Sequence, residues 1–266
     1  MNYSELVQQL HLDALIRAAL QADERVQFAL AYGSFTQGSG DRFSDVEYYA
    51  FVEKQQEFEI LAWLEHALTG SEFRILHHVV NEFGTPNVTV SGLIRIELHV
   101  QPVERMPDIL HWPGEHIHPE RMLVKDQDGK LRALLQELAS KPEAEPSAEA
   151  QLILDRAVNW LVFGLNVLRR GEGVRALELL RWIQSALLRL ARIREGQTTH
   201  WLNPFRRAER ELSPVTLRRY ATVTGGLNDL ERCYRAAWGW LLEFASALDL
   251  HLSPDLRCEL TATLAE

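Results

Sequence analysis

Three acidic side chains with strand-like spacing are the residues of this sequence best suited to chemistry. Asp45 and Glu47 lie at the start of a segment rich in strand formers, and strand alternation places them on one side, about 7 Å apart along the backbone. Glu97 stands in the middle of an otherwise apolar segment. If the two segments are neighbouring strands, the three carboxylates converge and provide the oxygen ligands that Mg²⁺ prefers.

A glycine-containing turn precedes the first two carboxylates. Gly33 and Ser34 follow a predicted strand, and Asp45 comes 11 positions after Ser34. The amides of this turn and the Ser34 hydroxyl are suited to hold phosphate oxygens, while a bound metal ion neutralises charge on a transferring phosphoryl group. No Gly-x4-Gly-Lys-Ser/Thr motif occurs, which excludes a P-loop, and no Gly-x-Ser-x-Gly motif supports Ser34 as a nucleophile.

Short strands and helices are predicted around these residues. Val26–Tyr32 and Asp45–Val52 are rich in strand formers. Ile94–Val100 alternates cleanly, which places its apolar residues on one face and Glu97 on the other. Further strands are predicted at 75–80, 87–90 and 122–125, and helices at 5–21 with Ser4 as the N-cap, at 56–68 and at 130–140.

The sequence after residue 148 is predicted to be helical throughout. Its apolar stripes have helical spacing and lie at 154–168, 180–190 and 227–250. The polar segment 141–148 contains two prolines and is predicted to be a linker. The expected fold class is α+β, with a mixed sheet and flanking helices in residues 1–140 and an all-α helical bundle in residues 149–266.

The composition excludes several classes of protein. The chain has 266 residues, of which 46% are hydrophobic, and this apolar content is too high for a disordered protein. Residues 1–140 carry 11 basic and 21 acidic side chains, which argues against a protein that binds nucleic acid. With no visible signal peptide or membrane span, and with Cys233 and Cys258 expected to be buried or half-buried free thiols, the sequence predicts a cytoplasmic protein.

The turn and the carboxylates together resemble the signature of nucleotidyltransferases of the DNA polymerase β type, in which Gly-Ser precedes Asp-x-Asp or Asp-x-Glu. Within that superfamily, the chain is similar to the lincosamide nucleotidyltransferases, and the similar segments follow in the same order. These segments are Tyr32–Thr36, Gly38–Asp41, Ser44–Glu47 and Leu93–His99 in the first part, and Asn159-Trp160, Gly164–Leu168, Arg170–Glu172 and Ala176–Leu180 in the helical part.

The resemblance implies an enzyme that transfers a nucleoside monophosphate from the Mg²⁺ complex of a nucleoside triphosphate, ATP or GTP. The acceptor would be a hydroxyl of a lincosamide antibiotic, which is thereby inactivated. By position, Asp45, Glu47 and Glu97 would bind Mg²⁺, and Glu97 would also remove the proton from the acceptor hydroxyl. Gly33 and Ser34 would hold the triphosphate.

The resemblance also implies a role for the helical part, which would cover the nucleotide and the acceptor. Members of this family tend to be homodimers with sites near the subunit interface. Relatives often have a basic residue where this chain has Gln37, so the phosphate charge has to be met elsewhere. Arg42 and the pair Arg169 and Arg170 are the candidates for that contact.

Alternatives to these assignments stay open. The same catalytic centre can serve an aminoglycoside or another hydroxylated small molecule, because the acceptor is chosen by the pocket. A protein of another class, a non-catalytic nucleotidyltransferase-like antitoxin or binding partner, is the second alternative. Glu97 can instead form an ion pair with Arg95 or His99. A loop segment holds a weaker candidate metal site, made of His111, Glu115, His116 and His118.

Overall fold

The chain divides into two units, Met1–Glu143 and Ala144–Glu266. The computed structural model describes residues 6–82, 84–114, 116–141 and 145–265. Ser4, the expected N-cap of the first helix, and residues 142–144 of the expected linker lie outside the described residues. Among the helices that are described, none combines the length and the apolar content that a membrane span requires.

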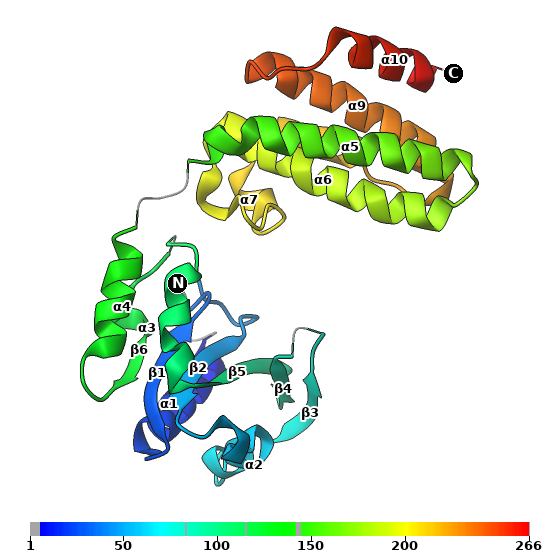
Figure 1. The fold of residues 1–266 in the computed structure, drawn as a ribbon. Coiled ribbons are helices and arrows are strands. Elements are labelled where there is room, and N and C mark those ends of the chain that lie inside the picture. Colours follow the sequence, from blue (N-terminus) through cyan, green and yellow to red (C-terminus); the bar gives the residue numbers. More distant parts are fainter. Residues whose placement is uncertain (1–5, 83, 115, 142–144, 266) are drawn as a thin grey trace. The chain divides into compact units, whose positions relative to one another are not determined.

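A six-stranded mixed sheet forms the centre of the first unit (Figure 1). Its strand order is β3-β4-β5-β2-β1-β6, in which β2 and β5 are parallel and the other neighbours are antiparallel. The predicted strands are confirmed, with bounds that differ by two residues at most. The strands are β1 (Val26–Tyr32), β2 (Val46–Val52), β3 (Ile75–Val80), β4 (Pro86–Val90), β5 (Ile94–Pro102) and β6 (Leu123–Asp126).

The three helices predicted in the first unit are present, although one begins later than predicted, and the helical elements Val103–His111 and Pro119–Met122 were not predicted. Phe58 and Glu59 are extended, so the helix predicted from residue 56 begins only at Ile60. Phe58 is buried with its ring 5.8 Å from that of Trp63, and this packing accounts for the late start. The helical elements are α1 (Val7–Ala22), η2 (Gln55–Glu57), α2 (Ile60–Ala67), η3 (Val103–His111), α3 (Pro119–Met122) and α4 (Lys130–Ala139), where η denotes a 3-10 helix.

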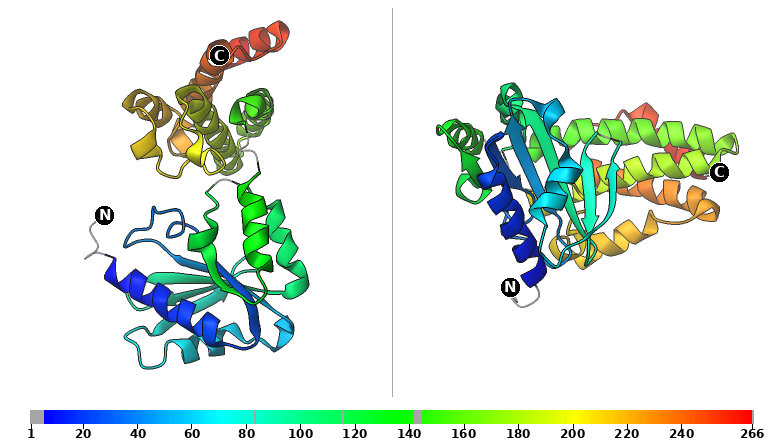
Figure 2. Two further views of the ribbon diagram at one scale, coloured as in Figure 1. Left: turned by 90° about the vertical axis from the view of Figure 1, so that its left-hand side faces the viewer. Right: turned by 90° about the horizontal axis from the view of Figure 1, so that it is seen from below.

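Strand alternation gives the sheet two different faces. On the first face, Tyr48 and Ile96 pack with the apolar side of α1 and with α2. On the second face, Phe28 and Phe51 pack with η3 and α4, so α1 and α4 lie on opposite sides of the sheet (Figures 1 and 2). Glu97 alternates with buried residues of β5 and therefore belongs to the second face.

The helices α5 and α6 form the centre of the second unit, and α9 packs against both (Figure 1). Gly164 of α5 permits this close packing, because an added Cβ would lie 1.9 Å from the hydroxyl oxygen of Tyr234 on α9. The α+β class with an all-α second part is thereby confirmed. The helical elements are η4 (Pro146–Glu149), α5 (Ala150–Arg169), α6 (Gly173–Glu195), η5 (Thr198–His200), α7 (Ala208–Glu211), α8 (Pro214–Thr222), η6 (Leu227–Asp229), α9 (Leu230–Ala247) and α10 (Pro254–Ala265).

Both cysteines lie in helices of the second unit as free thiols. Cys233 is buried in α9, but Cys258 is exposed on α10, so the expectation of a buried or half-buried thiol is wrong there. The reason is that α10 buries only one side, through Leu260 and Leu264.

Candidate active site

The loop after β1 closes into a tight turn. The carbonyl of Gly33 accepts hydrogen bonds from the Gln37 amide at 3.2 Å and from the Thr36 hydroxyl at 2.9 Å. Within the part of the chain that the structure describes, the amides of Ser34 and Phe35 donate to no acceptor. These two amides can therefore serve an anion such as a phosphate oxygen, which is the chemistry predicted for this turn.

Gly33 and Glu47 lie in direct contact across β1 and β2. An ideal Cβ on Gly33 would stand 1.6 Å from Oε2 of Glu47, and the residue has a φ of +78°. Both the backbone conformation and the space thus require glycine. The carboxylate of Glu47 therefore lies directly against the turn that begins at Gly33.

The register of three adjacent strands brings the expected residues together. Tyr32 at the end of β1 pairs with Glu47 on β2, and Glu47 pairs with Glu97 on β5. Because β2 and β5 are parallel, Glu47 and Glu97 lie side by side on the same face of the sheet. Asp45 precedes β2 by one residue.

Two neighbours hold one oxygen of Glu97. The hydroxyl of Tyr32 donates to Oε1 of Glu97 at 2.8 Å, and Nε2 of His99 lies 2.9 Å from the same oxygen. An ionised carboxylate only accepts, so the second contact requires the hydrogen on Nε2. Burial and the bond to Glu97 raise the pKa of Tyr32 well above its usual value, which keeps its hydroxyl a donor. The ring of His99 is stacked on that of Tyr49 at 4.1 Å.

Arg95 connects the other carboxylates. Its guanidinium lies 3.0 Å from Oδ2 of Asp45 and 3.4 Å from Oε2 of Glu97. Burial raises the pKa of Asp45, the positive charge of Arg95 lowers it, and the negative charge of Glu97 raises it again. The contacts of Glu97 with Arg95 and His99 that the sequence left open as an alternative thus both exist, and they lie within the carboxylate cluster.

The carboxylate oxygens of this cluster are the type of ligand that a divalent cation such as Mg²⁺ binds. Asp45, Glu47 and Glu97 offer the carboxylate oxygens that Mg²⁺ prefers, and a positive group already lies between two of them. Within the described residues, however, no three side chains of His, Cys, Asp or Glu are close enough to hold a metal ion as they stand.

The arginines expected at the phosphates come from both units. Arg42 is exposed in the loop before β2, where its guanidinium stacks 4.5 Å over the ring of Phe43. Arg170 is the C-cap residue of α5 in the second unit. The contact of Tyr32 with Glu97 and that of Arg95 with Asp45 were not predicted, although Arg95, Glu97 and His99 share the polar face of β5.

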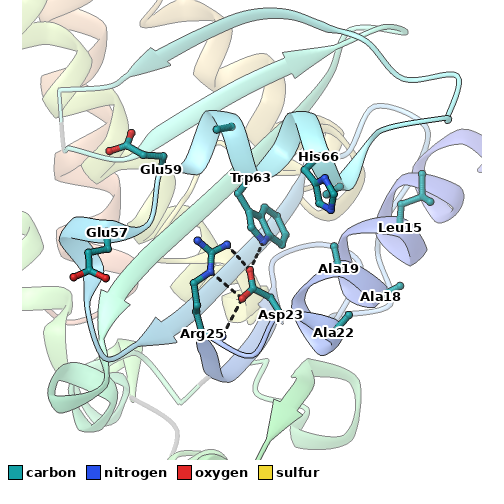
Figure 3. A pocket seen from close by; sticks show the side chains of 12 residues that line it. Leu15, Ala18, Ala19, Ala22, Asp23, Arg25, Glu57, Glu59, Trp63 and His66 are labelled. Carbon is teal, nitrogen blue, oxygen red and sulfur yellow. Dashed lines mark hydrogen bonds and ion pairs between the residues drawn. The ribbon is translucent and has the colours of Figure 1, made fainter.

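A cavity of about 760 Å³ lies between α1 and α2, apart from these carboxylates (Figure 3). Asp23 stands in it, paired with Arg25 at 2.7 Å and accepting from the indole of Trp63 at 2.9 Å. The weaker candidate metal site at His111, His116 and His118 shows no group of three ligands among the described residues, and Glu115 lies outside them.

Residues 147–265 match the family model described as lincosamide nucleotidyltransferase-like, C-terminal domain. The helical unit is thus similar to that domain, which confirms the resemblance over that part of the chain and agrees with the expected class of enzyme. No curated protein matches the chain.

Two solved structures are similar to the chain. The first is an aminoglycoside 6-adenyltransferase from Bacillus subtilis, with 14% identity over 96% of this chain and 95% of that one and a TM-score of 0.41. The second is a nucleotidyltransferase-like protein from Exiguobacterium sibiricum 255-15, with 16% identity over 90% of this chain and 74% of that one and a TM-score of 0.38. At such scores the likeness carries no inference about the site.

Proposed function

We propose that this chain is an Mg²⁺-dependent nucleotidyltransferase that moves a nucleoside monophosphate from ATP or GTP to a hydroxyl of a small antibiotic. The observation that carries the proposal is the placement of Glu47 beside Glu97 on parallel strands, with the Gly33 turn against Glu47. The family of the helical unit makes a lincosamide the first candidate acceptor. We expect a cytoplasmic homodimer that binds no nucleic acid.

In this proposal the carboxylates and the turn divide the work of binding. Asp45, Glu47 and Glu97 would hold Mg²⁺, which when bound neutralises the charge on the transferring phosphoryl group. In the turn that begins at Gly33, the hydroxyl and the backbone amide of Ser34 would hold phosphate oxygens. Arg42 and Arg170 stay candidates for further phosphate contacts.

Glu97 then acts on the acceptor. It takes the proton of the acceptor hydroxyl, and the freed oxygen forms a bond to the α-phosphorus. The bond from the α-phosphorus to the bridging oxygen breaks in line, and pyrophosphate leaves with the electron pair. Tyr32 and His99 hold Oε1 of Glu97 during this step, which fixes the orientation of the base.

Mass spectrometry tests the function directly. Purified full-length protein is incubated with Mg²⁺, mixed nucleoside triphosphates, lincomycin, clindamycin and a panel of aminoglycosides. We expect one nucleoside monophosphate to be added to a lincosamide, and no addition when EDTA replaces Mg²⁺. Addition to an aminoglycoside alone would support the proposed nucleotidyl transfer and show that the acceptor is not a lincosamide.

Thermal unfolding separates the enzyme from a non-catalytic binding partner. An enzyme of this kind is stabilised by nucleotide only when Mg²⁺ is present, because the metal links the phosphates to the carboxylates. A protein that modifies none of the acceptors and gains no Mg²⁺-dependent stabilisation from ATP or GTP does not have the proposed function.

Tyr32→Phe tests how the base is positioned. The substitution removes the hydroxyl that donates to Glu97 at 2.8 Å, and a hydrogen bond to a charged group contributes about 1.5–3 kcal/mol. We therefore expect kcat to fall by about 10- to 100-fold, while KM for the nucleotide changes little. Steady-state kinetics with varied nucleotide measures both constants.

Tyr49→Phe is the matched control. Tyr49 lies on the same face and stacks on His99, but its hydroxyl has no acceptor among the residues that the structure describes. Its removal should leave kcat within about twofold of wild type. Equal rates for the two variants would show that the Tyr32 hydroxyl does not position the base.

A further inference from the structure

The guanidinium of Arg95 lies between two of the carboxylates that are proposed to hold the metal ion. This group lies 3.0 Å from Oδ2 of Asp45 and 3.4 Å from Oε2 of Glu97, and it comes from the strand that carries Glu97. Oε1 of Glu97 is already held by Tyr32 and His99. Arg95 therefore contacts the other carboxylate oxygen of Glu97, Oε2, which neither Tyr32 nor His99 contacts.

The positive charge of Arg95 compensates a cluster of like charges. Asp45 and Glu97 are half-buried, with 33% and 20% of their side-chain surface exposed, so their mutual repulsion is only partly screened by water. Arg95 places a positive charge between these two carboxylates and offsets part of their repulsion.

The same side chain can leave the cluster at little cost. Arg95 is 48% exposed, and an ion pair with that exposure contributes about 1 kcal/mol or less. A long, flexible side chain at the surface can turn into solvent without rearranging β5.

We propose that Arg95 is an internal counter-ion that competes with the divalent cation for Asp45 and Glu97, so that a metal ion binds only as Arg95 is displaced. This inference rests on the proposed metal-dependent function and adds a residue to it. Its consequence is weak binding of free metal ions, because each bound ion must first displace a positive charge from the cluster.

Titration of Mn²⁺ into the nucleotide-free, full-length protein tests this competition without any turnover, with free Mn²⁺ followed by electron paramagnetic resonance. Arg95→Gln removes the charge and should tighten Mn²⁺ binding by about tenfold. Arg95→Lys keeps the charge and should bind Mn²⁺ about as weakly as wild type. Arg105→Gln is the control, since Arg105 forms an exposed ion pair with Asp108 at 2.9 Å outside the site and should leave the affinity unchanged.

Two further measurements separate the possible failures. In EDTA, Arg95→Gln should have a lower Tm than wild type, and Mn²⁺ should raise the Tm of this variant by more than that of wild type. A lower Tm with unchanged Mn²⁺ affinity would show a merely stabilising ion pair and overturn the competition. Asp45→Asn should abolish Mn²⁺ binding, and if it does not, the proposed metal site itself is wrong.

Discussion

Asp45→Asn is expected to reduce the rate of nucleotidyl transfer by about 10³-fold or more. The substitution removes one carboxylate charge from the proposed metal site, and the charge stabilisation that such a site supplies to the transition state amounts to several kcal/mol. Folding should be nearly unaffected, because Asp45 is 33% exposed and its partner Arg95 is 48% exposed. The initial rate of product formation and the Tm of the same preparation measure the two effects.

Asp108→Asn is the control for this substitution. Asp108 also pairs with an arginine, Arg105, at 2.9 Å, but on the exposed surface of η3. The variant should transfer at the wild-type rate. If Asp45→Asn does so as well, the proposed mechanism is wrong, whatever the acceptor.

Gly33→Ala is expected to impair both activity and stability. The added methyl group would meet Oε2 of Glu47 at 1.6 Å, so the carboxylate or the turn has to move. A misplacement of about 1 Å in an active site can cost about 10²-fold in rate, and we expect at least that loss in kcat. The left-handed backbone at a φ of +78° adds a further cost of about 1–2 kcal/mol to folding. Steady-state kinetics and urea unfolding measure the two losses.

Gly129→Ala separates the two causes. Gly129 has a φ of +80°, but an added Cβ would meet no atom within 4 Å. This variant should therefore show only the conformational cost of about 1–2 kcal/mol and the wild-type kcat. A Gly33→Ala protein with the same profile would show that the contact with Glu47 has no bearing on transfer.

Much of the sheet was predictable because local patterns carry the information. Val26–Tyr32 was predicted with both bounds, and the alternation of Ile94–Val100 reappears as alternating burial in β5. The helix predicted from residue 56 failed at its start, because the burial of Phe58 against Trp63 overrides the helical spacing. Side-chain burial of this kind depends on the folded context and leaves no periodic signal.

The sequence by itself determined the chemical groups and the strand on which each one stands. The order of Gly33, Asp45 and Glu47, and the position of Glu97 on the polar face of its strand, follow from local spacing and alternation. The tertiary structure decided that these residues lie together, because the parallel register of β2 and β5 places Glu47 beside Glu97. Strand pairing between segments distant in the sequence depends on the packing of the whole unit, so no local pattern encodes it.

The tertiary structure also decided which neighbours act on the base. Tyr32 comes from β1, and Arg95 and His99 from β5, yet all three contact the Glu97 carboxylate. Spacing along the chain identified Arg95 and His99 as possible partners but could not indicate that Tyr32 would reach the same oxygen. Only the pairing of β1 with β2 and of β2 with β5 brings that hydroxyl within 2.8 Å, because hydrogen bonds across a sheet require a defined register.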